Sequence, residues 1–215
     1  REYRPCLTKS WTEPKSGVQN RFPSRLLERC VSLCVPCFGY SIPPMPIPLQ
    51  DGWLYGPVDS RRYGRSLGVN PLPVDRKLCS LDCLYCQYGF TKAQEAAGRA
   101  ELPGLDELKA AFEQEFSRLA AANDLPDRIT VAGNGEPSLH PDFLEMSRAL
   151  CASRDRHFPG ASIGLLCNSM HLNRQDVVEA INGFYDEPAM KLEWGTAECF
   201  AAMNRVPASR FKALL

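Results

Sequence analysis

From residue 52 onward, the apolar positions of the chain follow two alternating periods. Residues 106–123 repeat apolar side chains every three or four positions, which predicts an amphipathic helix. Residues 162–168 form a short, almost wholly apolar run, which is typical of a strand buried on both faces. The same reasoning predicts further strands at 66–71, 127–132 and 189–194, and further helices at 141–153, 173–182 and 197–204.

Strands that alternate with helices predict an α/β fold, because each crossover helix returns the chain to a parallel neighbouring strand. Four such units predict a partial barrel or a doubly wound sheet within one domain of this 215-residue chain. The pattern stops at the final residue without a terminal element. We therefore expect the domain to be incomplete at its C-terminus.

The first 44 residues differ from the rest in composition and in pattern. They mix proline, serine, arginine and cysteine without helical or strand periodicity, and the first methionine is Met45. We therefore expect 1–44 to be a non-native or disordered leader. The folded domain is expected to occupy 45–215.

Charge and hydropathy exclude some classes of partner. Twenty-five basic side chains balance 25 acidic ones, which gives no electrostatic support for binding to nucleic acid or to a membrane surface. The most apolar early stretch, 30–49, contains five prolines and cannot form a spanning helix. No secretory signal pattern is present. We expect a cytoplasmic protein whose ten cysteines are reduced or bound to metal.

Three of those cysteines, Cys79, Cys83 and Cys86, follow the first predicted strand with Cys-x3-Cys-x2-Cys spacing. Soft thiolate ligands suit an iron–sulfur cluster, and three ligands leave one iron of a four-iron cluster open for chemistry. A structural zinc site would need a fourth ligand, and no second Cys or His pair follows. An electron carrier would also need a fourth cysteine. Unligated core cysteines are the remaining interpretation.

A second run has the same cysteine spacing but another context. Cys30, Cys34 and Cys37 lie within the expected leader, and Pro36 stands where Tyr85 stands in the first run. No predicted strand precedes them. Their role stays open.

Two motifs together resemble the radical SAM superfamily. Cys79, Cys83, Tyr85 and Cys86 match its Cys-x3-Cys-x-aromatic-Cys pattern. The residues at 132–137, Ala-Gly-Asn-Gly-Glu-Pro, are similar to its Gly-Gly-Glu-Pro motif at the end of the second strand. Asn134, which separates the two glycines, departs from that motif. The resemblance implies a partial (β/α)6, TIM-like barrel, of which about four β/α units are present here.

The resemblance extends to one branch of this superfamily. Residues 56–70 look like the opening of a branch of uncharacterised iron–sulfur oxidoreductases, which are related to the radical enzyme of tRNA wybutosine synthesis. The segments Lys191-Leu192-Glu193 and Asn204-Arg205-Val206-Pro207 are similar to segments of that branch. A base-modifying activity on tRNA is therefore one alternative, although the charge balance does not support a nucleic-acid substrate.

The resemblance implies roles for particular residues. The cysteines would hold a [4Fe–4S] cluster that reductively cleaves S-adenosylmethionine (SAM) to a 5′-deoxyadenosyl radical. A low-potential donor, similar to flavodoxin or ferredoxin, would supply the electron, and the substrate is unknown. Glu136 would bind the SAM amine, and Tyr85 would shield the cluster. The other residues expected to bind the cofactor are Gly133, Asn134, Gly135, Pro137, Asn168 and Lys191.

An electron-transfer protein without SAM chemistry is a second alternative, but it would have no need of Glu136 and its glycines.

Other reactive side chains receive simpler interpretations. His140, His157 and His171 show no metal-ligand spacing. The basic residues Arg61, Arg62 and Arg65 are interpreted as a solvated loop, with contact to an anionic substrate as the alternative.

Overall fold

The computed structural model describes residues 46–91 and 101–214. The chain divides into two units, Arg1–Gly39 and Tyr40–Leu215, and every element below belongs to the second unit. The predicted leader, 1–44, lies outside the described residues, as does the cysteine run from Cys30 to Cys37. Both predictions therefore stay untested.

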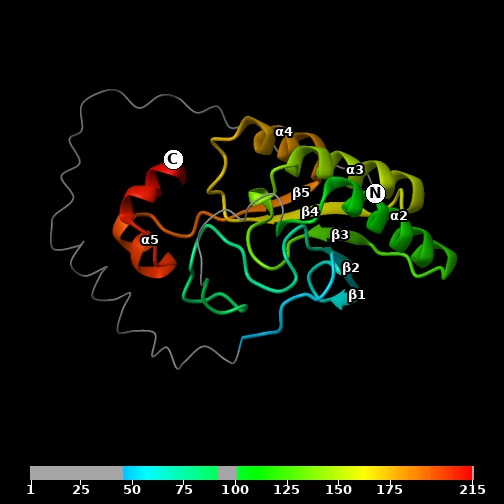
Figure 1. The fold of residues 1–215 in the computed structure, drawn as a ribbon, viewed down its shortest axis with the longest axis horizontal. Helices are drawn as coiled ribbons and strands as arrows, with labels where there is room; N and C mark the ends of the chain where they lie inside the picture. The colour runs from blue at the N-terminus through cyan, green and yellow to red at the C-terminus, as the bar shows by residue number, and fades with distance from the viewer. Residues whose placement is uncertain (1–45, 92–100, 215) are drawn as a thin grey trace, which may run out of the picture. The chain divides into compact units, whose positions relative to one another are not determined.

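A five-stranded sheet forms the centre of the second unit (Figure 1). Its strands lie in chain order: β1 (Leu54–Ser60), β2 (Gly64–Val69), β3 (Arg128–Val131), β4 (Ser162–Cys167) and β5 (Glu187–Met190). β2 to β5 run parallel to one another, while β1 pairs antiparallel with β2. The predicted α/β class with a parallel sheet is confirmed.

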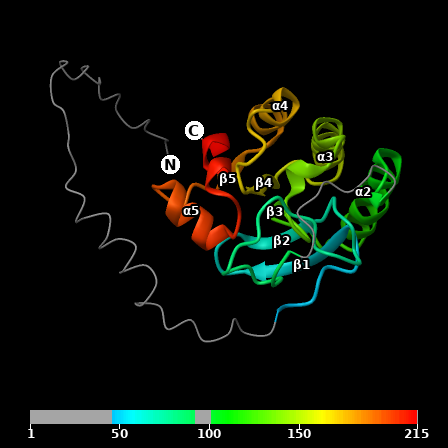
Figure 2. The ribbon, with the colours of Figure 1, turned by 60° about the vertical axis from the view of Figure 1, so that its left-hand side comes forward.

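Helices connect the parallel strands, and three of them lie side by side along the sheet (Figures 1 and 2). These are α2 (Leu105–Ala121), α3 (Phe143–His157) and α4 (Gln175–Phe184). The remaining helices are α5 (Ala197–Asn204) and two short 3-10 helices, η2 (Pro137–Leu139) and η3 (Ala208–Leu214). All four predicted helices are present. Within the described ranges, no helix combines the length and apolar character that a membrane crossing requires.

Alternation along the strands separates an outer from an inner face of the sheet. The outer positions pack against α2, α3 and α4 and are almost fully buried: Leu67, Val69, Ile129, Val131, Ile163 and Leu165. The inner face carries small and polar residues between them, such as Ser66 and Thr130, whose hydroxyls lie 3.0 Å apart. Leu166, on this inner face, is 41% exposed. The prediction that 162–168 is buried on both faces is therefore wrong.

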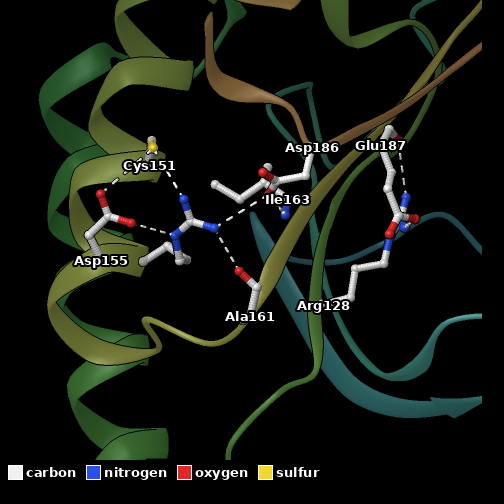
Figure 3. Close-up of polar contacts among 8 residues, drawn as sticks. Arg128, Cys151, Asp155, Ala161, Ile163, Asp186 and Glu187 are labelled. Carbon is white, nitrogen blue, oxygen red and sulfur yellow. Dashed lines mark hydrogen bonds and ion pairs between the residues drawn. The ribbon is translucent and has the colours of Figure 1, made fainter. Parts of the chain in front are cut away.

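Two strand glycines on the inner face are required by side chains that lie across them. A Cβ atom at Gly68 would lie 2.1 Å from the ring of Tyr55, and one at Gly164 would lie 1.8 Å from Nη2 of Arg128. The Arg128 side chain, only 4% exposed, passes over Gly164 and contacts the carboxylate of Glu187 (Figure 3). It thereby joins β3 to β5 across β4.

Polar contacts also fix the ends of β4 and β5. The carboxylate of Asp186 accepts a 2.7 Å hydrogen bond from the backbone N–H of Ile163, and it lies 3.4 Å from the Arg154 guanidinium. Arg154, from α3, donates to the carbonyl of Ala161 at 2.6 Å (Figure 3). These contacts hold the α3–β4 loop against the start of β5, so the register of the two strands is set at their N-terminal ends.

Candidate functional site

A cavity of about 590 Å³ opens where the parallel strands end. The carboxyl ends of parallel strands are the usual place for a ligand site in α/β folds, because consecutive loops meet there. Loops after all four parallel strands contribute to the lining. The predicted site residues among the lining are Cys79, Cys83, Tyr85, Cys86, Gly133, Gly135, Glu136, Asn168 and Lys191.

The three thiols of the predicted cluster line this one cavity. Cys79, Cys83 and Cys86 are all free and partly buried. Burial raises the pKa of the Cys79 thiol to about 12, against the opposing effects of a Leu81 backbone hydrogen bond and the Lys77 charge. Burial also raises the pKa of Cys83. Thiols with raised pKa values keep their protons near neutral pH. Binding of a metal centre would therefore release these protons.

The three cysteine sulfurs are soft ligands, but they are not arranged around a common point in the structure. Among the described residues, no three His, Cys, Asp or Glu side chains form an arrangement that could hold a metal ion. The three thiols thus share a cavity without forming such an arrangement. Cysteine sulfurs, once deprotonated, are the ligands that iron–sulfur clusters use.

Backbone pairing holds the cysteine loop against the loop after β3. Leu78 and Gly135 form a parallel bridge, in which the Leu78 N–H donates to Asn134 and the Glu136 N–H donates to Leu78. The approach is close: a Cβ atom at Gly135, where φ is +148°, would lie 1.6 Å from the Leu78 carbonyl oxygen. Gly135 is therefore required by packing between the two loops as well as by its place in the cavity wall.

Glu136 places a buried carboxylate in the cavity wall. The residue is 2% exposed, and its oxygens accept hydrogen bonds from the Ser138 N–H at 3.1 Å, the Ser138 hydroxyl at 2.6 Å and the Asn168 N–H at 2.7 Å. No ion pair to it is present in the described part of the chain. Burial raises its pKa. The Cys167 thiol, a weak donor, also hydrogen-bonds to this carboxyl group, so a cationic ligand in the cavity can compete for that acceptor position.

Ser138 connects Glu136 to a histidine that the sequence did not single out. Nδ1 of His171 lies 3.0 Å from the Ser138 hydroxyl. Because that hydroxyl donates to Glu136, its oxygen accepts a hydrogen bond from Nδ1–H of His171. Burial, together with Arg174 and Arg210, lowers the pKa of His171 to about 4 and keeps it neutral. His171 is 33 residues from Ser138 in the sequence, so no local spacing could have indicated this contact.

Asn168 ties three loops together from its position after β4. Its side-chain amide donates to the Ser80 hydroxyl at 2.9 Å and lies 3.7 Å from Sγ of Cys79. Its carbonyl oxygen accepts from the Met170 N–H at 3.0 Å, which is a local turn contact. Asn168 is thus both a turn former and a neighbour of the first thiol.

Tyr85 and Lys191 meet at the other side of the cysteine loop. The Tyr85 hydroxyl donates to the carboxylate of Glu193 and lies 3.1 Å from Oδ1 of Asn204. Nζ of Lys191 lies 4.7 Å from the centre of the Tyr85 ring and 3.4 Å from Glu193. Burial and the Glu193 contact raise the pKa of Tyr85. The segment after β5 therefore braces the loop that carries the thiols.

Two predicted cofactor-binding residues do not line the cavity. Asn134 is fully buried, and its side chain bonds to the backbone of Gln50, at 2.8 and 2.9 Å, and to the Pro73 carbonyl at 2.9 Å. Pro137 begins η2 behind the cavity wall. The side chain between the two glycines thus joins chain segments, while the flanking glycines face the cavity.

Comparisons with known proteins find several relatives that carry the name UPF0026. The UPF0026 protein of Methanocaldococcus jannaschii is 32% identical over 151 residues, which cover 70% of this chain and 43% of that protein. The UPF0026 protein of Synechocystis is 31% identical over 152 residues, covering 71% and 52%, and that of Helicobacter pylori is 35% identical over 97 residues, covering 45% and 30%. The chain spans at most about half the length of these relatives. No protein-family model and no solved structure matches it.

Proposed function

We propose that this chain is part of a radical SAM enzyme, with Cys79, Cys83 and Cys86 as ligands of a [4Fe–4S] cluster and SAM bound beside it. When bound, the cluster passes one electron from a low-potential donor to SAM, which splits into methionine and a 5′-deoxyadenosyl radical that removes a hydrogen atom from the substrate. The parallel strands β2 to β5 are consistent with about four units of a partial (β/α)6 barrel.

The observation that carries the proposal is the meeting of the thiols with Glu136 in one cavity. The thiols come from the loop after β2, and the buried carboxylate comes from the loop after β3. Thiols alone would suit a zinc site or an electron carrier. A buried carboxylate without an ion-pair partner suits the ammonium group of an amino-acid ligand.

Hydrogen bonds hold that carboxylate in place before any ligand arrives. Ser138 and the Asn168 backbone hold both oxygens of Glu136 in the cavity wall. Gly133 and Gly135 present backbone without side chains in the same wall, which lets a ligand approach closely. The chain's own contribution is therefore to bind and orient the methionyl end of SAM.

The brace around Tyr85 limits the movement of the thiols. Tyr85 lies between Cys83 and Cys86 in sequence and is fixed by Glu193, from the segment after β5. The ammonium group of Lys191 lies over the ring face of Tyr85. Its positive charge opposes the rise that burial causes in the pKa of Cys83. We expect this brace to position the cysteine loop for cluster binding.

Anaerobic reconstitution with iron and sulfide, followed by reduction and addition of SAM, tests the proposal directly. We expect 5′-deoxyadenosine to form, and to be lost in Cys83→Ala and Cys86→Ala. Cys151→Ala is the matched control, because Cys151 lies on α3 away from the cavity. Zinc binding without iron would contradict the proposal. A cluster that forms but leaves SAM intact would favour the electron-transfer alternative.

A further inference from the structure

The cavity extends along the inner face of the sheet, away from the thiols. Besides the loops at the strand ends, its lining includes Tyr55, Arg62 and Tyr63. Tyr63 immediately precedes β2, whereas Cys79 lies beyond its last residue. The cavity therefore reaches from the loops at the carboxyl ends of the strands to side chains near the start of β2.

Two guanidinium groups gather on the ring of Tyr63 at this second end. Cζ of Arg128 lies 4.2 Å from the ring centre, and Cζ of Arg62 lies 5.2 Å from it. The charge of Arg128 is matched by Glu187, which contacts it from β5 (Figure 3). Among the ion pairs of the described residues, none matches the charge of Arg62. The nearby Arg65, by contrast, pairs with two aspartates.

The other charges of the cavity lie near the thiols and are accounted for there. Nζ of Lys77 donates to the Gly89 carbonyl at 2.7 Å, and Lys191 pairs with Glu193. Among the described residues that line the cavity, Glu136 is the one acidic residue, and it belongs to the loop after β3. The end at Tyr63 therefore has an unmatched positive charge, with a second guanidinium behind the same ring.

We propose that Arg62 binds an oxyanion of the substrate, a carboxylate or a phosphate, at this end of the cavity. Guanidinium groups bind both anions through two parallel hydrogen bonds, and the Tyr63 ring supports the Arg62 side chain through a cation–π contact. This inference rests on the proposed function for the reactive end. It deepens that function by naming the substrate class: a molecule whose anionic group lies toward the start of β2 while its reacting carbon lies toward the thiols.

Arginine modification on the full chain tests the anion site without any cluster or SAM. The chain is treated with phenylglyoxal alone, with inorganic phosphate or with citrate, at matched ionic strength, and peptide mass spectrometry measures the modified fraction of each arginine. We expect phosphate or citrate to slow modification of Arg62 by about fivefold or more, because one charge-assisted contact changes affinity by about tenfold. Arg61 is the internal control, because it is an exposed neighbour outside the cavity lining.

Binding measurements on two variants complete the test. By isothermal titration calorimetry, Arg62→Gln should lose most of the affinity for the protecting anion, while Arg61→Gln should keep it. Protection by phosphate alone would indicate a phosphorylated substrate, and protection by citrate alone would indicate an organic acid. Equal protection of Arg61 and Arg62, or none of either, would overturn the inference. Because no step depends on SAM cleavage, this failure is distinguishable from failure of the proposed function.

Discussion

The backbone N–H of Asn168 donates a 2.7 Å hydrogen bond to the carboxylate of Glu136, 32 residues earlier in the chain. The bond joins the loop after β3 to the loop after β4 at the wall of the cavity. It also fixes one oxygen of a buried acidic group that has no ion-pair partner among the described residues. Glu136 is therefore held in a set orientation that a cationic ligand can use.

Replacement of this carboxylate should weaken SAM binding. We expect Glu136→Gln to lower the affinity for SAM by about tenfold or more, because a hydrogen bond to a charged group is lost in a buried site. Equilibrium dialysis with labelled SAM measures the effect on reconstituted protein. Glu145→Gln is the control, since Glu145 lies on α3 in an exposed pair with Arg148. Equal affinities in the two variants would contradict the assigned role of Glu136.

Two glycine substitutions should change stability in opposite directions. Gly135→Ala is expected to lower the free energy of unfolding by about 3 kcal/mol or more, because its Cβ would collide with the Leu78 backbone at a positive φ. Gly183→Ala, within α4 and with open space around it, should raise that free energy by about 0.5–1 kcal/mol. Urea denaturation measures both. A stability of Gly135→Ala equal to that of the unmodified chain would show that the two loops can separate freely.

Asn134→Ala separates a packing role from a cofactor-binding role. Its loss leaves buried groups of Gln50 and Pro73 without partners, so we expect the free energy of unfolding to fall by about 2–4 kcal/mol. SAM affinity per folded molecule should stay unchanged, because Asn134 does not line the cavity. Asn182→Ala, at an exposed position of α4, is the stability control. A stable variant with weak SAM binding would restore the cofactor role that the motif predicted.

Burial of His171 beside Arg174 and Arg210 should make stability depend on pH. The folded chain lowers the pKa of His171 from 6.5 to about 4, so below pH 6.5 the unfolded chain binds a proton that the folded chain does not. The free energy of unfolding should therefore fall as the pH drops from 6.5 to about 4, by about 1–2 kcal/mol after allowance for solvent screening of a partly buried group.

His171→Asn isolates this contribution. The asparagine amide can donate to Ser138 in place of Nδ1–H but does not titrate. Urea denaturation across the acidic range should give the variant a flatter pH dependence than the unmodified chain. Parallel profiles for the two proteins would show that His171 does not contribute.

The helices were predictable because their apolar period is local, and the structure places each within a few residues of the prediction. β1 was missed because a strand with Gly56 and Pro57 at its centre lacks the apolar period of a buried strand. It forms only as an antiparallel edge next to β2. The last predicted strand, 189–194, instead spans Glu187–Met190, and it ends at Met190 because that residue pairs with Cys167 at the end of β4. Both differences arise from pairing between strands, which sequence period does not report.

The sequence by itself determined the order of the parallel strands and of the helices, and the loop that carries the three cysteines. Both follow from periods and spacings within a few turns of chain. Only the tertiary structure decided that Asn134 joins chain segments, that Ser138 and Asn168 hold Glu136, and that Arg62 shares a ring with Arg128. The physical reason is that parallel strands are connected through helices. The side chains that meet at a strand end, or across the inner face, are therefore dozens of residues apart, and no local pattern records which of them touch.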